Sequence, residues 1–141
     1  MIFLNEPLED RDQVINFIVD QAKNNGFIKE KDEFLQALLE REKVSSTAFE
    51  FKIAIPHGKA DTVVEPFVSF LSTEEPFVWD KQGEEKETQY VFLIGVPEKG
   101  GSKIHLKYIS EVSKKLLDEN FRDRLFNSSE LDEAYEVLSA I

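Results

Sequence analysis

The segment QYVFLIGV, residues 89–96, constrains the fold more than any other part of the sequence. It is almost continuously apolar, whereas a strand with one face in water alternates apolar and polar residues. A strand of this kind is buried on both faces, so it lies inside a sheet that other elements cover on both sides. The segment therefore predicts a layered α/β domain with helices above and below the sheet.

Apolar residues recur at helical intervals before and after this segment. They predict helices over residues 10–25 and from about 31 to 41, with Gly26 where a C-terminal cap is expected. Helical spacing returns over residues 104–125 and again over 131–138. The candidate N-caps for the last helix are Ser128 and Ser129.

Two further runs between the helical segments predict strands. FEFKIAI, residues 49–55, alternates, and PFVSFLS, residues 66–72, is short and apolar. The charged stretch DKQGEEKET, residues 80–88, predicts a solvated loop. Because no repeat, low-complexity tract or linker interrupts the 141 residues, we expect one α/β domain over residues 1–141.

Charge and cysteine content exclude several classes of protein. The net charge of −11 argues against nucleic acid and anionic membranes as partners, because binding to either relies on Lys and Arg. The acidic excess serves solubility or steers a basic protein partner, and charge does not separate the two. Without cysteine there is no disulfide, thiol nucleophile or thiolate metal site. The start MIFLNEPLED lacks the features of a signal peptide, so a cytoplasmic location is expected.

Nucleotide and zinc motifs are not matched. Gly95 and Gly100 have the gap of a phosphate-binding Walker loop, but Gly101 stands where its lysine would be. The fingerprint GxGxxG is absent. The two histidines, His57 and His105, are 48 positions apart and give weak support for zinc. Carboxylates could complete a zinc site, so the residues alone leave that alternative open.

His57 lies in the segment KIAIPHGKAD, directly after the second predicted strand. Open α/β sheets place ligands where strands end. Pro56 restricts the backbone before it, and Gly58 leaves room for an approaching partner. A lone histidine is more often structural, but neutral imidazole is a nucleophile that can accept and release a phosphoryl group. These features together favour His57 as a phosphoryl carrier.

His105 and Arg41 are candidates to assist it. If Ser102 caps the following helix, His105 lies in the first turn, where the helix dipole favours an anion and a neutral imidazole. A partly buried structural histidine explains the same pattern equally well. Arg41, 16 positions before His57, could stabilise phosphoryl charge. On the residues alone, an ordinary exposed arginine at a helix C-terminus is the better interpretation.

Two longer segments, LLEREKVSSTAFEFKIAIPHGKAD and KIHLKYISEVSKKLLDENFRDRL, resemble a known family. The family is the enzyme IIA component of the fructose–mannitol class, type 2, of the bacterial phosphoenolpyruvate-dependent sugar phosphotransferase system. The most specific pieces are Arg-Glu, Ser-Thr, Ala-Ile-Pro-His-Gly and the later His-Leu, and the likeness covers essentially the whole chain. It implies a mixed β-sheet of about five strands with helices on both faces.

The resemblance also implies a role for each candidate. His57 matches the histidine that takes a phosphoryl group from the phosphocarrier protein HPr and passes it to the enzyme IIB component of a sugar permease. His105 matches the second active-centre histidine, which supports the phosphorylated one. Arg41 matches the active-site arginine, which reverses its interpretation from the residues alone. The implied activity is a cytoplasmic phosphotransferase without cofactor, metal, nucleic acid or membrane insertion.

Residues 48–52, AFEFK, depart from the family, in which this segment usually contains glycine. Phe49 and Phe51 are therefore of interest. We expect one of them in the core, and the other either in the core or in an apolar docking surface.

A second function uses the same histidine. In the nitrogen-related branch of the family, phosphorylation of His57 would switch the binding of partner proteins, and no sugar would be modified. The stretches PFVWDKQGEE and HLKYIS favour the fructose-like transport branch. A metal-dependent hydrolase that uses both histidines is a poor fit.

Overall fold

The computed structural model describes residues 1–80, 86–99, 101–127 and 130–138, and the side chains of 101–106, 108 and 137–138 lie outside the described part. None of the helices within these ranges is long and apolar enough to cross a membrane. The elements in chain order are β1 (Ile2–Glu6), α1 (Arg11–Asn24), α2 (Lys31–Val44), β2 (Ala48–Phe49), β3 (Ile53–Ala54), β4 (His57–Lys59), β5 (Phe67–Val78), β6 (Glu87–Val96), α3 (Gly101–Leu116), α4 (Glu119–Phe126) and α5 (Leu131–Leu138).

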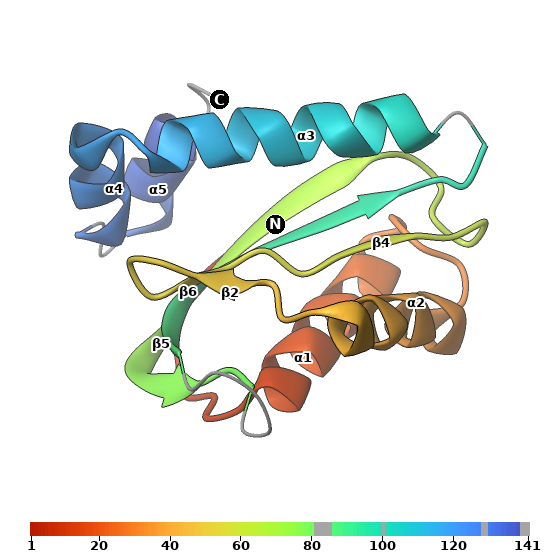
Figure 1. Ribbon diagram of the computed structural model, residues 1–141, viewed down its shortest axis with the longest axis horizontal. Helices are drawn as coiled ribbons and strands as arrows, with labels where there is room; N and C mark the ends of the chain where they lie inside the picture. The colour runs from red at the N-terminus through yellow and green to blue at the C-terminus, as the bar shows by residue number, and fades with distance from the viewer. Residues whose placement is uncertain (81–85, 100, 128–129, 139–141) are drawn as a thin grey trace.

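The strands form one mixed sheet around β6, as predicted. Its order is β1-β5-β6-β3-β2, and β4 pairs with β6 beyond β3. β6 runs antiparallel to β5 and parallel to both β3 and β4. β1 is parallel to β5, and β2 is antiparallel to β3. In Figure 1, α3 crosses one face of the sheet while α1 and α2 cover the other.

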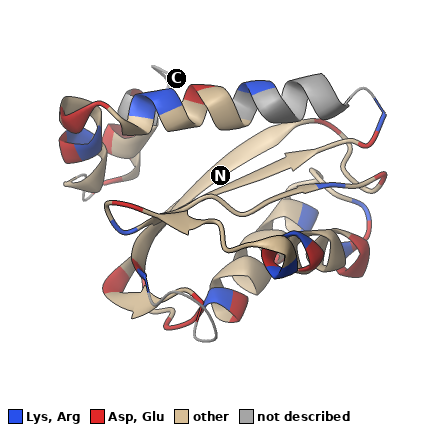
Figure 2. Ribbon diagram, in the orientation of Figure 1, with Lys and Arg blue, Asp and Glu red and all other residues tan. Residues whose placement is uncertain are grey.

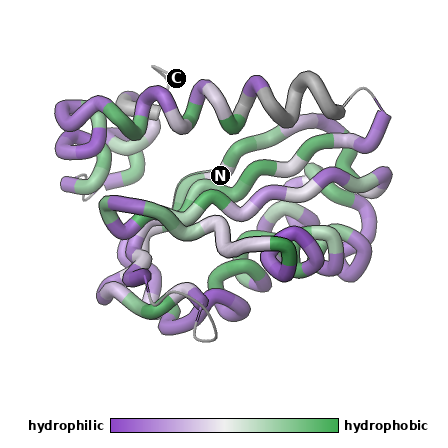
Figure 3. The backbone as a smooth tube through the Cα atoms, viewed as in Figure 1, coloured by the Kyte–Doolittle hydropathy of each residue, from purple (hydrophilic) through white to green (hydrophobic). Residues whose placement is uncertain are grey.

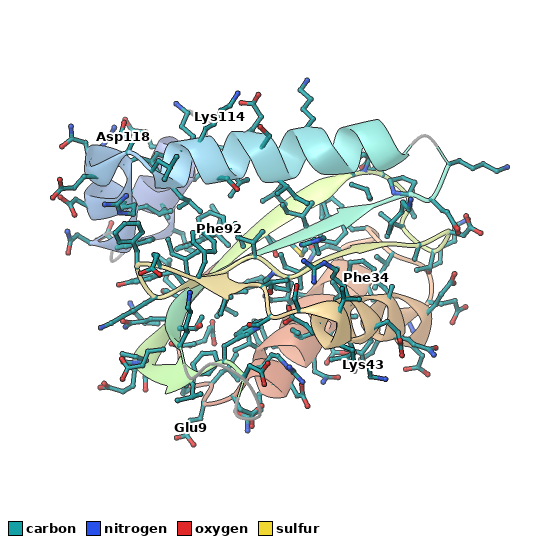
Figure 4. The ribbon with its side chains drawn as sticks, viewed as in Figure 1. Glu9, Phe34, Lys43, Phe92, Lys114 and Asp118 are labelled. Carbon is teal, nitrogen blue, oxygen red and sulfur yellow. The ribbon has the colours of Figure 1, made fainter. Side chains whose placement is uncertain are left out.

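The side chains of β6 alternate between two hydrophobic cores. Val91 and Leu93 belong to the core under α1 and α2. Phe92 and Ile94 belong to the core under α3, α4 and α5. Figure 3 shows the central strands as hydrophobic, Figure 2 shows charges mainly on helices and connecting segments, and Figure 4 labels Phe92 between the sheet and α3. The continuous apolar run therefore fills both sides of the sheet, as its sequence predicted.

Helix ends follow local chemistry. The side chain of Asp10 accepts a hydrogen bond from the Gln13 amide at 2.8 Å and begins α1. Gly26, with φ of 80°, ends it, because the Phe27 amide can then donate to the Ala22 carbonyl at 2.9 Å. The predicted end of α2 at residue 41 was one turn short, since the helix continues to Val44.

The predicted helix over residues 104–125 is two helices. Asp118 separates α3 from α4, and its carboxylate caps the first amides of α4. The apolar spacing does not reveal this break, because the residues on both sides face the same core. Ser128 and Ser129, the predicted N-caps of α5, lie outside the described residues.

The predicted strand over residues 49–55 is a tight hairpin. Phe49 pairs with Ile53, and residues 50–52 form the turn between β2 and β3. Phe51 and Lys52 have φ of 63° and 61°, the left-handed region that glycine adopts without strain. The turn explains why glycines suit this segment, and here two residues with side chains adopt that conformation instead.

Phe49 and Phe51 have different environments. Phe49 packs against the core under α3, α4 and α5, as expected for one of the pair. Phe51 is half exposed, and the guanidinium of Arg122 lies 3.7 Å from the centre of its ring. The hairpin tip is thereby held against α4 by a cation–π contact.

The sequence analysis missed β1 and shortened β5. β1 pairs with the middle of β5, and the Asn5 amide donates to the Ser72 hydroxyl at 2.9 Å where the pairing shifts register. Of the predicted loop over residues 80–88, residues 81–85 lie outside the described residues, and β6 already begins at Glu87.

Candidate active site

His57 begins β4 instead of standing beyond the end of a strand. β3 and β4 both pair with β6, and the break between them falls at Ile55 and Pro56. The backbone is held on both sides of the break, because the amide of Ile94 donates to the Pro56 carbonyl at 3.0 Å and His57 pairs with Ile94. The imidazole therefore projects from a fixed kink in the sheet.

The hydrogen bonds of His57 define its tautomer. Nδ1 lies 2.9 Å from the backbone oxygen of Ile55. A carbonyl oxygen only accepts, so Nδ1 carries the proton and Nε2 is the unprotonated nitrogen. Nε2 accepts a hydrogen bond from Nε of Arg41 at 3.1 Å. The nitrogen that can act as a nucleophile is therefore Nε2.

Arg41 reaches His57 from the last turn of α2. Its Nη1 donates to the carbonyl oxygen of Ser45 at 2.8 Å, which anchors the guanidinium where α2 ends. The structure thus brings together two residues that are 16 positions apart, and it places the guanidinium on the nucleophilic nitrogen.

Gly58 lies under α2, so it does not leave room for an approaching partner as the sequence suggested. It is buried in β4, and a Cβ there would lie 3.2 Å from Cδ2 of Leu38 and 3.3 Å from Cε1 of Phe34, both on α2. The missing side chain lets α2 pack directly on β4. This packing sets the distance from α2, and so from Arg41, to His57.

The surroundings of His57 keep its imidazole neutral. Partial burial lowers the pKa of His57 below 6.5, and the charge of Arg41 lowers it further. The hydrogen bond to Ile55 and the carboxylate of Glu42 oppose this and raise the pKa, but the net direction is downward. The neutral, nucleophilic form therefore dominates at neutral pH.

His57 and Arg41 line an open pocket of about 400 Å³. Phe49 of the hairpin forms part of the wall on one side, and Ile109 of α3 and Leu117, which directly follows α3, form part of the wall on the other. The pocket lies between the hairpin and α3, and its other lining residues are mostly apolar, with the hydroxyl residues Ser46, Thr47 and Ser113 among them. A small charged group and the surface of a partner protein could both enter it.

The side chain of His105 lies outside the described residues. Its backbone belongs to α3, one helical turn before Ile109, which lines the pocket. The expectation that Ser102 caps this helix is wrong, because α3 already begins at Gly101.

Glu42 is a buried carboxylate beside the site that sequence reasoning did not single out. Its Oε2 accepts from the Thr47 amide and from Nε1 of Trp79, each at 3.2 Å, and its Oε1 accepts from the Thr47 hydroxyl. The Arg-Glu pair in the sequence was the available signal, but neighbouring charges on a helix usually lie in solvent. Only the fold shows that Glu42 turns inward while Arg41 faces the pocket.

No metal centre is formed by the side chains that the structure describes, among which no three His, Asp or Glu residues gather as ligands. The charged and titratable groups at the site are one neutral imidazole, one guanidinium and one buried carboxylate. This set suits an anion that binds through charge and hydrogen bonds.

Comparisons with known proteins identify the family. Residues 1–141 match the family described as phosphoenolpyruvate-dependent sugar phosphotransferase system, EIIA 2. The fructose-specific EIIA component of Haloferax volcanii is 34% identical over all of this chain and 90% of its own length.

Solved structures share the fold. Enzyme IIAMTL of Escherichia coli, solved in complex with phosphorylated enzyme IIBMTL, is 26% identical, with a TM-score of 0.82 over 99% of this chain and 94% of that one. The nitrogen regulatory protein IIA-Ntr of Neisseria meningitidis has a TM-score of 0.83 over 97% of this chain and 92% of that one, and at 24% identity it shows the fold alone. The chain belongs to the EIIA type 2 family of the phosphoenolpyruvate-dependent sugar phosphotransferase system.

Proposed function

We propose that this protein is a phosphohistidine carrier that accepts a phosphoryl group from HPr on Nε2 of His57 and passes it to an enzyme IIB component. The observation that carries the proposal is the pair of hydrogen bonds on the imidazole. Nδ1–H donates to the Ile55 carbonyl, and the electron pair of Nε2 faces Arg41 in an open pocket. This arrangement presents one nucleophilic nitrogen together with one cation.

The transfer step follows from these contacts. The electron pair of Nε2 attacks phosphorus, a P–N bond forms on His57, and the bond between phosphorus and the donor breaks with its electrons left on the donor. No proton has to leave His57, because Nε2 is already unprotonated. The N–H of Arg41 that donates to Nε2 then donates to a phosphoryl oxygen, which stabilises the negative charge. Transfer to enzyme IIB is the same step with His57 as the donor.

His105 is proposed to support the phosphorylated imidazole. The proposal rests on the sequence match and on the position of residue 105 in α3, one turn from the pocket wall at Ile109. The pocket faces both α2 and α3, so groups from both helices can approach the phosphoryl oxygens.

A role in sugar uptake is favoured over the regulatory branch. The Haloferax relative, which matches the whole chain at 34% identity, is named as fructose-specific. The mannitol protein that shares the fold was solved with its phosphorylated enzyme IIB partner.

Labelling from phosphoenolpyruvate through enzyme I and HPr tests the proposal. We expect an acid-labile, base-stable label on the wild type, none on His57→Ala, and a phosphorus NMR signal of phosphohistidine substituted at Nε2. His105→Ala should still accept the label but pass it on more slowly to enzyme IIB. A wild-type protein that stays unlabelled while HPr is phosphorylated would refute the proposal, and substitution at Nδ1 would refute the assigned nitrogen.

A further inference from the structure

The buried carboxylate of Glu42 has no part in the transfer step described above. Only 6% of the residue is exposed, yet it lies next to Arg41 in the sequence and within one turn of the end of α2. Burying a carboxylate is costly unless hydrogen bonds compensate, and three donors from two residues surround this one. A group this costly to bury calls for a role that an apolar side chain could not fill.

The hydrogen bonds lead from Glu42 to His57. The carboxylate holds the amide and the hydroxyl of Thr47. The carbonyl of Thr47 accepts from the amide of Ile55 at 3.1 Å. The carbonyl of Ile55 in turn accepts from Nδ1 of His57 at 2.9 Å. Each step fixes the backbone group that makes the next one.

The other end of this chain of contacts is equally fixed. Nε1 of Trp79, at the end of β5, donates to Glu42 at 3.2 Å, and Trp79 is buried in the core under α1 and α2. Glu42 therefore connects α2, the core and the segment that leads into the hairpin. The Ile55 carbonyl keeps its place relative to α2 through this connection, and Arg41 belongs to α2 as well.

We propose that Glu42 is a positioning residue for phosphoryl transfer, which holds Thr47 and, through the Thr47–Ile55 hydrogen bond, keeps the proton of His57 on Nδ1. The proposal rests on the proposed function of His57. Without the carbonyl of Ile55 in place, the ring can carry its proton on Nε2, and a protonated Nε2 cannot attack phosphorus. The position of the Ile55 carbonyl therefore decides what fraction of the protein has an unprotonated Nε2 and can accept a phosphoryl group.

Two substitutions separate the contribution of hydrogen bonding from that of charge. Glu42→Gln can keep all three contacts, because its carbonyl oxygen can take the two N–H donors and its amide group can donate to the Thr47 hydroxyl. Glu42→Ala removes all three. Glu40→Gln is the matched control, since Glu40 is exposed on the same helix and pairs with Lys43 at 3.0 Å.

The measurement is the tautomer of His57, read from nitrogen–proton correlation spectra of the imidazole of the unphosphorylated protein, together with the rate of labelling from HPr. For Glu42→Ala we expect a mixed tautomer population and labelling slowed about tenfold or more. Loss of a group that orients a metal-binding histidine through a hydrogen bond has an effect of this size. Glu42→Gln should keep the Nδ1–H tautomer and recover most of the rate. If Glu42→Ala does not fold, Thr47→Val, which removes only the hydroxyl contact, should show the same changes to a smaller degree.

The result that overturns the inference is a folded Glu42→Ala or Thr47→Val protein with the tautomer and labelling rate of Glu40→Gln. Equal loss of rate in Glu42→Ala and Glu42→Gln with an unchanged tautomer would overturn it too, because charge and not position would then act. The two proposals fail separately, since the tautomer is measured without any phosphoryl donor. An unlabelled wild type refutes the proposed function and leaves the tautomer result standing.

Discussion

Replacement of Arg41 by lysine keeps the positive charge but should slow phosphoryl transfer. The guanidinium uses Nη1 for the Ser45 carbonyl at 2.8 Å and Nε for Nε2 of His57 at 3.1 Å, so it is anchored and still directs N–H groups at the reacting nitrogen. A lysine ammonium is a single point and cannot hold both partners in the same plane. At least one charge-assisted hydrogen bond to the phosphoryl group is then lost.

The expected size of the effect follows from that one bond. A hydrogen bond to a charged group contributes about 1.5–3 kcal/mol, so transfer should slow by about 10- to 150-fold. Arg41→Gln removes the charge as well, and it should be slower still. Because the charge of Arg41 lowers the pKa of His57, Arg41→Gln should also raise that pKa, whereas Arg41→Lys should leave it nearly unchanged.

Rapid-quench labelling from phosphorylated HPr measures the rate, and NMR titration of the imidazole measures the pKa. Arg124→Lys is a matched control, because Arg124 is exposed on α4, away from the pocket lining. If Arg41→Lys transfers the phosphoryl group at a rate within about twofold of that control, the role given to the guanidinium is refuted. A change of about twofold is much smaller than the effect expected from losing one charged hydrogen bond.

Three further predictions concern pH and packing. Because the pKa of His57 is lowered below 6.5, labelling from HPr should be independent of pH near neutrality and fall only below 6.5. The unfolded imidazole binds its proton first, so urea titrations should show that the stability contributed by His57 is complete above pH 6.5 and is lost as pH falls from 6.5 through the lower pKa of the folded protein. Gly95→Ala would place a Cβ 2.7 Å from Cζ of Phe67 and 2.9 Å from Cζ of Phe34, and this overpacking should lower the free energy of unfolding by about 1–3 kcal/mol. An unchanged urea midpoint would contradict the packing described for β6. Lys52→Gly should raise the free energy of unfolding by about 0.5–1 kcal/mol, because glycine adopts the left-handed backbone of residue 52 without strain. Lys52→Ala is the control and should leave the free energy of unfolding nearly unchanged. A glycine variant that is less stable than the wild type would show that the turn is not strained.

Sequence patterns predicted the elements whose signal is local. The apolar run over 89–96 indicated a strand buried on both faces, and β6 is that strand. Helical spacing located α1 and α2 within a turn of their observed ends, and Gly26 marked the end of α1. These features depend on residues a few positions apart, which is the range over which periodicity and capping act.

Elements whose signal is not local were missed. β1 has too few residues for an alternating pattern to be recognised. It becomes a strand because it pairs with β5, which lies more than 60 positions away in the sequence. The strand predicted over 49–55 turns back at residues 50–52, because β3 continues on β6 while β2 pairs on its other side. Alternation of side chains is the same for one straight strand and for two paired ones.

The sequence alone determined the class of fold and singled out His57 as a candidate nucleophile, since an imidazole next to Pro56 and Gly58 is a local feature. Only the tertiary structure decided the surroundings of this imidazole, on which its proposed role depends. The Ile55 carbonyl selects the tautomer, α2 packs on Gly58 and brings Arg41 to Nε2, and Glu42 turns away from its neighbour into the core. The physical reason is that hydrogen-bond direction and charge proximity depend on distances across the sheet, which only the packing of α2 against β4 sets.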